Sequence, residues 1–238
     1  MAFAIEWDKV GEHFYETGIS RGVLYPIDAT KTTGDNKYGE GVAWNGLTSV
    51  SESPEGAEVS AIYADNIKYL NLMSAEDFKG TIEAYTYPDE FAECDGSATL
   101  LSGIKIGQQP RKIFGLCYRT EIGNDETSEK GYKLHLVYNC LASPSERSYE
   151  TINDSPEAIT FSWEFSTTPV NVTDHKPTAV VTIDSTALAD SAKLALLEAA
   201  LYGTNDSTTI SSISAKITAY TGKPMLLLPD EIVTLLSA

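Results

Sequence analysis

Polar and apolar side chains alternate without a break in the segment 160–166. Three aromatic residues occupy one side and hydroxyl or carboxylate residues the other: Phe161, Trp163 and Phe165 against Thr160, Ser162, Glu164 and Ser166. Successive side chains of a β-strand point to opposite faces. The alternation therefore predicts a strand whose aromatic face packs on a core and whose polar face meets solvent or another surface.

Comparable segments fill most of the chain between residues 19 and 183. They are rich in β-branched and aromatic residues and are bounded by turn-forming residues, which predicts strands at 22–27, 41–50, 80–87, 112–120, 132–140, 158–165 and 178–184. The strands at 112–120 and 132–140 flank a polar connection with glycines at its ends, at Gly123 and Gly131. This spacing predicts one long hairpin.

One helix is predicted at 189–203. Asp190 or Ser191 can cap its start and Gly203 can end it, while leucines recur at helical spacing, at Leu194, Leu197 and Leu201. We expect the leucine side to pack on a sheet.

The last part of the chain is less regular. The polar stretch 204–214 is typical of a linker or surface loop, whereas Pro229 before Asp230 and Glu231 is typical of the first turn of a helix. The patterns together predict a mainly β fold, a β-sandwich or partial barrel with one flanking α-helix. The expected domain covers 1–203, and 204–238 forms a polar loop and a C-terminal segment that packs on it.

The charge of the chain limits the partners it can bind. It has 17 Lys and Arg against 34 Asp and Glu, a formal net charge of -17. Static binding to nucleic acid depends on Lys and Arg that displace counterions, so a dedicated DNA-binding protein is not expected. The charged residues within 76–95 are acidic except for Lys79, and residues 105–119 carry bases without an acid. Such patches can meet on neighbouring copies of the chain or can each be solvated surface.

Signatures of chemistry are weak. Cys94, Cys117 and Cys140 form no CxxC pair, which favours reduced thiols and synthesis in the cytosol. The first ten residues do not resemble a signal peptide, and no stretch approaches the apolar length of a membrane span. No metal-ligand, nucleophile or nucleotide-binding spacing occurs, so no cofactor and no metal are expected. His135 lies on the polar side of its strand, where we expect it to face solvent.

Long segments of the sequence resemble the major tail proteins, or tail tube proteins, of long-tailed bacteriophages of Gram-positive bacteria. The resemblance covers about residues 1–203 and resumes at "LPDEIVTLL"; it is carried by "GVAWNGLTSVSESPEGAE", "MSAEDFKGTIEAYTYPDEFAECDG", "SPSERSYETINDSPEAITFSWEFSTTPV" and "KPTAVVTIDST". It implies a non-enzymatic virion protein whose copies form rings around a β-barrel lumen. The expected rings are hexameric. The rings stack into a tube that encloses the tape-measure protein and conducts double-stranded DNA.

The resemblance also implies locations and partners. The protein would be in the virion tail, and in the host cytoplasm during assembly, where it would meet further copies of itself and the tail terminator and distal tail proteins, with no membrane partner. Residues 51–66 would form an inter-ring loop. Candidate lumen or subunit-interface residues are Glu83, Tyr85, Arg119, Lys133, His135, Thr160, Ser162 and Glu164. A lumen lined by carboxylates and hydroxyls would repel phosphate and let DNA slide.

Two other classes of function remain open at this stage. A carbohydrate-binding or adhesive β-sandwich would use exposed aromatic side chains as platforms. A glycan hydrolase would use paired carboxylates within 83–95, such as Asp89 with Glu90 or Glu93 with Asp95.

Overall fold

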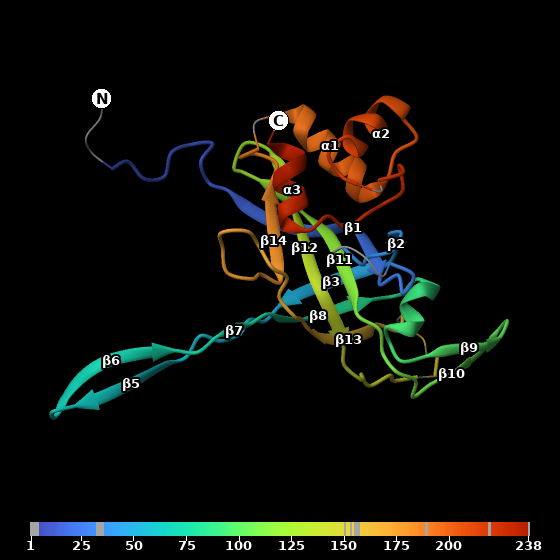
Figure 1. The fold of residues 1–238 in the computed structure, drawn as a ribbon, viewed down its shortest axis with the longest axis horizontal. Helices are drawn as coiled ribbons and strands as arrows, with labels where there is room; N and C mark the ends of the chain where they lie inside the picture. Colours follow the sequence, from blue (N-terminus) through green and yellow to red (C-terminus); the bar gives the residue numbers. More distant parts are fainter. Residues whose placement is uncertain are drawn as a thin grey trace.

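Strand β12 (Gly131–Ala142) is the central element of the molecule. The computed structural model describes residues 5–31, 36–149, 151–152, 154, 158–188, 190–218 and 220–237. Within them, β12 pairs along one side with β11 (Phe114–Gly123) and forms the predicted long hairpin. On its other side its first half pairs with β14 (Val180–Asp184) and its last two residues pair with β13 (Phe161–Ser166). One strand is thus shared by two sheets (Figure 1).

All pairings in the two sheets that share β12, here together called the main sheet, are antiparallel. The strand order is β2-β1-β11-β12-β13-β8-β3, with β14 added to β12. The remaining bounds are β1 Tyr15–Pro26, β2 Val42–Trp44, β3 Leu47–Glu52 and β8 Lys79–Ala84. Every predicted strand is present, and the mainly β fold is confirmed; the segment 41–50 contains two strands, separated by a turn at Asn45 and Gly46.

Two hairpins project from this sheet at opposite ends of the molecule (Figure 1). Between β3 and β8 the chain runs out through a short ladder, β4 (Glu55–Gly56) with β7 (Glu76–Asp77), to a hairpin of β5 (Val59–Ala64) and β6 (Ile67–Met73). After the 3-10 helix η1 (Asp89–Glu93) comes the second hairpin, β9 (Ala98–Leu101) with β10 (Ile104–Ile106). The segment 51–66, expected to be an inter-ring loop, is therefore mostly strand.

Within the described residues, three helices cover one face of the sheet; the sequence predicted one flanking helix and, at Pro229, the first turn of another. Helix α1 (Ser191–Tyr202) begins at Asp190, whose Oδ1 accepts a hydrogen bond of 3.0 Å from the Ala192 N–H, and ends at Gly203, as predicted. Helix α3 is Pro229–Leu236. The linker or loop expected at 204–214 is wrong, because Ser207–Ser214 form helix α2, capped by Asp206.

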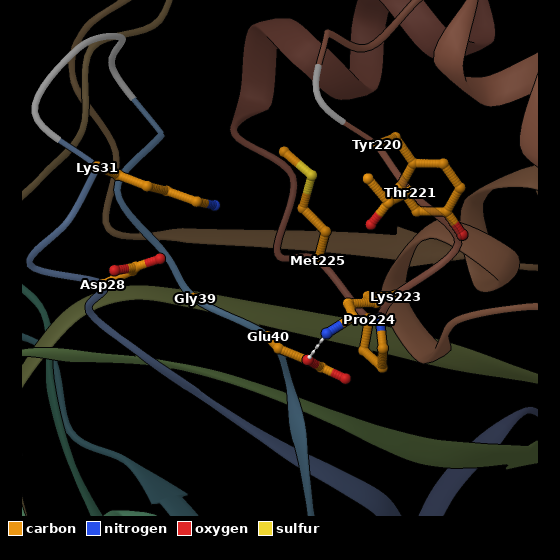
Figure 2. Close-up of a pocket in the computed structure, with 9 residues that line it drawn as sticks. All are labelled: Asp28, Lys31, Gly39, Glu40, Tyr220, Thr221, Lys223, Pro224 and Met225. Carbon is orange, nitrogen blue, oxygen red and sulfur yellow. Dashed lines mark hydrogen bonds and ion pairs between the residues drawn. The ribbon is translucent and has the colours of Figure 1, made fainter.

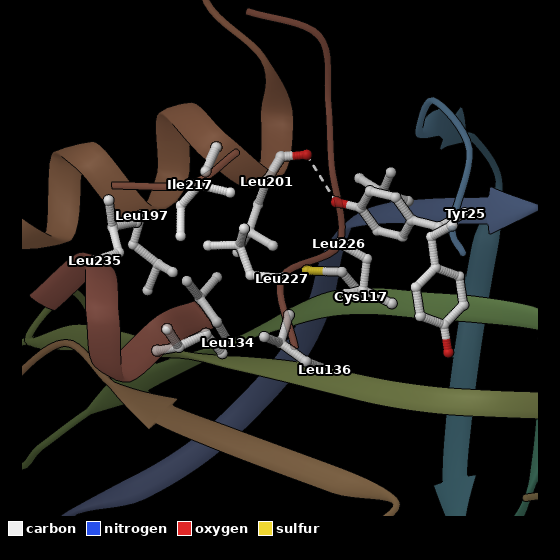
Figure 3. Packing of buried hydrophobic residues seen from close by; sticks show 14 of the residues in the cluster. Tyr25, Cys117, Leu134, Leu136, Leu197, Leu201, Ile217, Leu226, Leu227 and Leu235 are labelled. Carbon is white, nitrogen blue, oxygen red and sulfur yellow. Dashed lines mark hydrogen bonds between the residues drawn. The ribbon is translucent and has the colours of Figure 1, made fainter. Parts of the chain in front are cut away.

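The first core lies between these helices and the sheet. Leu134 and Leu136 from β12, Cys117 from β11 and Leu197 and Leu201 from α1 are all fully buried there (Figure 3). Tyrosines tie the layers together at their hydroxyls: Tyr25 Oη donates to the Leu201 carbonyl at 2.7 Å and Tyr138 Oη to the Leu227 carbonyl at 2.9 Å.

The second core lies on the opposite face of β12, between it and the sheet β13-β8-β3. It is aromatic: Phe91 of η1 lies 4.6 Å from Trp44 and 5.0 Å from Trp163, measured between ring centroids. The aromatic side of 160–166 therefore packs on a core, as predicted. Alternate residues of β12 enter different cores. A bulge near Asn139, whose φ is 49°, shifts the register at the place where the strand passes from one sheet to the other.

Candidate functional site

The outer face of the sheet β3-β8-β13 carries small polar and acidic side chains. Ser162 pairs in register with Glu83, and Glu164 with Thr81. On the other side of β8, Ser49 pairs with Glu83, and its hydroxyl donates to Glu83 Oε2 at 2.8 Å. Their neighbours Ile82 and Trp163 point the other way and are fully buried. The polar side of 160–166 is thus one stripe of a broader hydroxyl and carboxylate face, here called the acidic face: Ser49, Ser51, Thr81, Glu83, Ser162 and Glu164.

One cation lies at the end of the acidic face. Lys79 pairs in register with Ser166, and its Nζ lies 2.6 Å from Glu55 Oε2. This ion pair raises the pKa of the lysine. The charge of Lys79 is therefore matched within the chain, and the face as a whole remains negative.

The candidate residues fall into three groups. Glu83, Ser162 and Glu164 come together on the acidic face, with Thr160 exposed just before β13 and Tyr85 exposed just after β8. The candidates on the long hairpin lie elsewhere, and they divide between its two faces. Register and contacts separate Arg119, on the helix side, from Lys133 and His135, on the other side.

Arg119 is held within the chain. Its guanidinium lies 4.1 Å from the centre of the Tyr132 ring, and its Nη2 lies 2.8 Å from Glu121 Oε1. Lys133 forms an ion pair with Glu16 of β1. Both cations already have partners in the chain, which leaves them less able to bind phosphate.

His135 is mostly buried, contrary to the expectation that it faces solvent. Its ring stacks on Tyr118 with centroids 4.7 Å apart, and its Nε2 lies 3.0 Å from Thr120 Oγ1. Its Nδ1 has no hydrogen-bond partner among the described residues and lies 3.6 Å from Glu52 Oε1. Burial lowers the pKa of this histidine, against an opposing effect of the Glu52 carboxylate.

The acidic and basic segments noted in the sequence meet inside one chain. Lys105 Nζ lies 2.7 Å from Asp89 Oδ1, and Lys112 pairs with Glu93. The ion pair lowers the pKa of Asp89. These ion pairs partly neutralise both patches, so the patches are not free to attract a neighbouring copy through their full charge.

Exposed apolar side chains on the projecting segments were missed by sequence reasoning. On the hairpin β5-β6 they lie on both faces and include Val59, Ile62, Tyr63, Ile67, Tyr69, Leu70, Leu72 and Met73. The arm before β1 exposes Ile5, Trp7 and Val10, and the β9-β10 hairpin exposes Leu100, Leu101 and Ile104. The signal for β5-β6 was Asp65-Asn66 between apolar runs, because both residues take the positive φ of a two-residue hairpin turn.

The pocket in Figure 2 offers little for catalysis. It has a volume of about 230 Å³ and lies between the segment 28–40 and the segment 220–225. Both lysines that line it are engaged: Lys223 lies 2.6 Å from Glu40, and Lys31 donates to the Tyr38 carbonyl. Across the described residues, no group of three His, Cys, Asp or Glu side chains is arranged to hold a metal ion. None of the described helices is long and apolar enough to cross a membrane.

Comparisons with known proteins give structural similarities at a low level. No family model matches the sequence, and no curated protein sequence matches it. Among solved structures, one chain from the anti-feeding prophage baseplate is 10% identical, with a TM-score of 0.34, and 75% of this chain covers 97% of that one.

Two further similarities are to an extracellular contractile injection system in its extended state. A chain of the PVC sheath-tube complex is 12% identical, with a TM-score of 0.30, 69% of this chain covered and 88% of that one. A chain of the PVC sheath/tube terminator is 14% identical, with a TM-score of 0.28, 76% of this chain covered and 99% of that one. All three similarities are thus to components of injection-system or prophage particles, and similarity at this level assigns no function to the chain.

Proposed function

We propose that this protein is the tail tube protein of a long-tailed bacteriophage, a structural protein that assembles with copies of itself into stacked rings. The acidic face of β3-β8-β13 carries the proposal. One side of this sheet closes the aromatic core, and the other side presents hydroxyls and carboxylates in register. Such a face suits the wall of a channel that DNA must pass without adhering.

The edges of the sheet support self-association. Strand β3 ends the strand order, and its outer side has no partner strand among the described residues. An open edge offers unpaired backbone groups to another strand, and closure of a ring of copies would satisfy them. Residues 47–52 are then a surface for the neighbouring subunit.

The projecting segments supply contacts between copies. A two-stranded hairpin is marginal alone, and apolar side chains on both faces of β5-β6 leave it with no face suited to water. In the assembly this hairpin, which includes the second half of the predicted inter-ring loop 51–66, packs against another copy. The tape-measure protein occupies the lumen during assembly, and the terminator and distal tail proteins bind the ends of the tube.

The alternative of a carbohydrate-binding module has less to use. Trp44 and Trp163 are buried in the second core, so of the three tryptophans Trp7 alone is exposed. Saturable glycan binding by a monomer would favour that alternative.

The test is assembly of purified protein at rising concentration, followed by sedimentation and negative-stain microscopy. We expect rings or tubes from the wild-type chain. The double variant Ile62→Asp/Leu70→Asp changes a register pair on β5-β6 and should remain monomeric, whereas Asn71→Asp adds a charge at a polar position of the same hairpin and should assemble. A wild-type chain that stays monomeric at millimolar concentration would refute the proposal.

A further inference from the structure

The amino-terminal arm, residues 5–14, is attached to the tip of the β11-β12 hairpin mainly through the backbone of one residue, Gly11. The Gly11 N–H donates to both carboxylate oxygens of Asp125, at 3.0 and 3.1 Å. The Gly11 carbonyl accepts from Asn124 Nδ2 at 2.8 Å. His13 Nδ1 lies 3.1 Å from Asp125 Oδ2. Both hydrogen-bonding groups of Gly11 are therefore bound by adjacent side chains of one loop.

The loop is built to present these side chains. Asn124 is buried, with 4% exposure, and its Oδ1 accepts from the backbone N–H groups of Glu126 and Thr127, at 3.2 and 2.9 Å. The backbone N–H of Asn124 donates to the Thr127 carbonyl at 2.8 Å. Because the amide oxygen is engaged inside the loop, the Nδ2 group is directed at the arm.

The position of Gly11 disfavours residues with a side chain. Its φ is 87°, in the left-handed region that glycine favours, and a Cβ there would lie 3.1 Å from Glu126 Oε2. The contact thus selects a glycine in a particular conformation.

We propose that the loop Asn124–Thr127 is a recognition site for the backbone of Gly11, supported by the His13 side chain, and that it clasps the amino-terminal arm to the hairpin tip. Apolar packing does not hold the arm, because Ile5, Trp7 and Val10 are 73%, 76% and 78% exposed. The clasp fixes the arm while leaving these side chains directed away from the fold. It does so in the isolated chain and does not depend on the function proposed above.

The charges around the clasp agree with this assignment. The Gly11 N–H and then the His13 hydrogen bond lower the pKa of Asp125, so the ionised carboxylate is the form that binds the arm. His13 also lies 3.7 Å from Asp8, at Nε2 and Oδ1, and Glu126 is the other charged group that faces Gly11.

Amide hydrogen exchange on the full-length chain, followed by NMR, tests the clasp. We expect the Gly11 amide to exchange at least about tenfold more slowly than in a free peptide, because the bond to a carboxylate must open first. Asp125→Ala should abolish this protection. Gly103→Ala is the matched control for glycine substitution, since Gly103 has φ of 81° in open space, remote from the arm. Gly11→Ala should release the arm, and Gly103→Ala should leave it bound.

Limited proteolysis gives a second readout that does not require assignment of the amide. Trypsin should cleave after Lys9 several-fold faster in Asp125→Ala and Gly11→Ala than in the wild-type chain or in Glu129→Ala, a control on the same loop. Near-ultraviolet circular dichroism should show the same tertiary packing in all variants. Exchange of the native Gly11 amide at the free-peptide rate, or equal cleavage in Asp125→Ala and the wild type, would overturn the proposal.

Discussion

The Trp163 indole N–H donates a hydrogen bond of 3.1 Å to Asp95 Oδ1. The other oxygen of Asp95 pairs with Arg147, whose guanidinium lies over the Phe161 ring at 5.4 Å. Asp95 follows η1, Trp163 is central to β13, and Arg147 lies in the loop after β12. One carboxylate therefore joins three segments at the edge of the aromatic core.

Replacement of Asp95 should destabilise the fold. Asp95→Ala leaves the buried Trp163 N–H without an acceptor and Arg147 without its partner, which predicts a loss of about 2 to 3 kcal/mol in the free energy of unfolding. Asp95→Asn keeps an acceptor for Trp163 and should lose less. Urea unfolding measures both, with the exposed Glu129→Ala as control. A change below about 0.5 kcal/mol in Asp95→Ala would contradict the role of this contact.

Stability should depend on the protonation of His135. Burial lowers its pKa in the folded chain below the ordinary value of 6.5, so the unfolded chain binds the proton more tightly. The contribution of neutral His135 is therefore present above pH 6.5 and is lost as the pH falls from there toward the lower folded pKa. Thermal unfolding at pH 7.5 and at pH 5.5 measures the loss of stability between the two pH values. This loss should be smaller for His135→Gln than for the wild type. Equal losses in the two proteins would show that this histidine does not contribute.

Reversal of charge on the acidic face should create DNA binding. Glu83→Lys/Glu164→Lys places two cations on neighbouring strands where the wild type has carboxylates. We expect the assembled Glu83→Lys/Glu164→Lys variant to retain double-stranded DNA at low salt. It should release the DNA as the salt concentration rises, since counterion release drives such binding. Electrophoretic mobility shift measures retention. The same reversal away from the face, Glu129→Lys/Asp174→Lys, is the control, and equal DNA retention by both variants would argue against a channel role for this face.

The three thiols should be inert in the folded chain. Cys94, Cys117 and Cys140 are free and buried, and burial raises the pKa of each, to about 12 for Cys94 and Cys117. Thiolate is the reactive form, so a thiol reagent at pH 8 should label none of them until denaturant is added, and three afterwards. Labelling of the native chain within minutes would show that one of the two cores opens.

Local pattern was sufficient for elements that carry their own signals. The β-branched and aromatic segments 112–120 and 132–140, with the polar connection between them, predicted the long hairpin, and Asp190 and Gly203 marked both ends of α1. Helix α2 was missed because Ser, Thr and Ile are weak helix formers. The Asp206 cap is a local signal that sequence reasoning missed, whereas the burial of Ile213 in the first core depends on tertiary packing.

The arrangement of candidate residues depended on pairings between distant segments. The sequence predicted a polar side for 160–166 but not that Ser162 lies opposite Glu83, since register between β8 and β13 is set by the whole sheet. His135 was expected to face solvent because its strand alternates. Its burial comes from Tyr118 and Glu52 on two other strands.

The sharing of β12 between two sheets has a mechanical consequence. Its side chains enter both cores, and its backbone is bonded to β11 along one side and to β14 and β13 along the other. A sideways push on the sheet β13-β8-β3 is therefore passed to the helices through one continuous covalent strand, without sliding between layers.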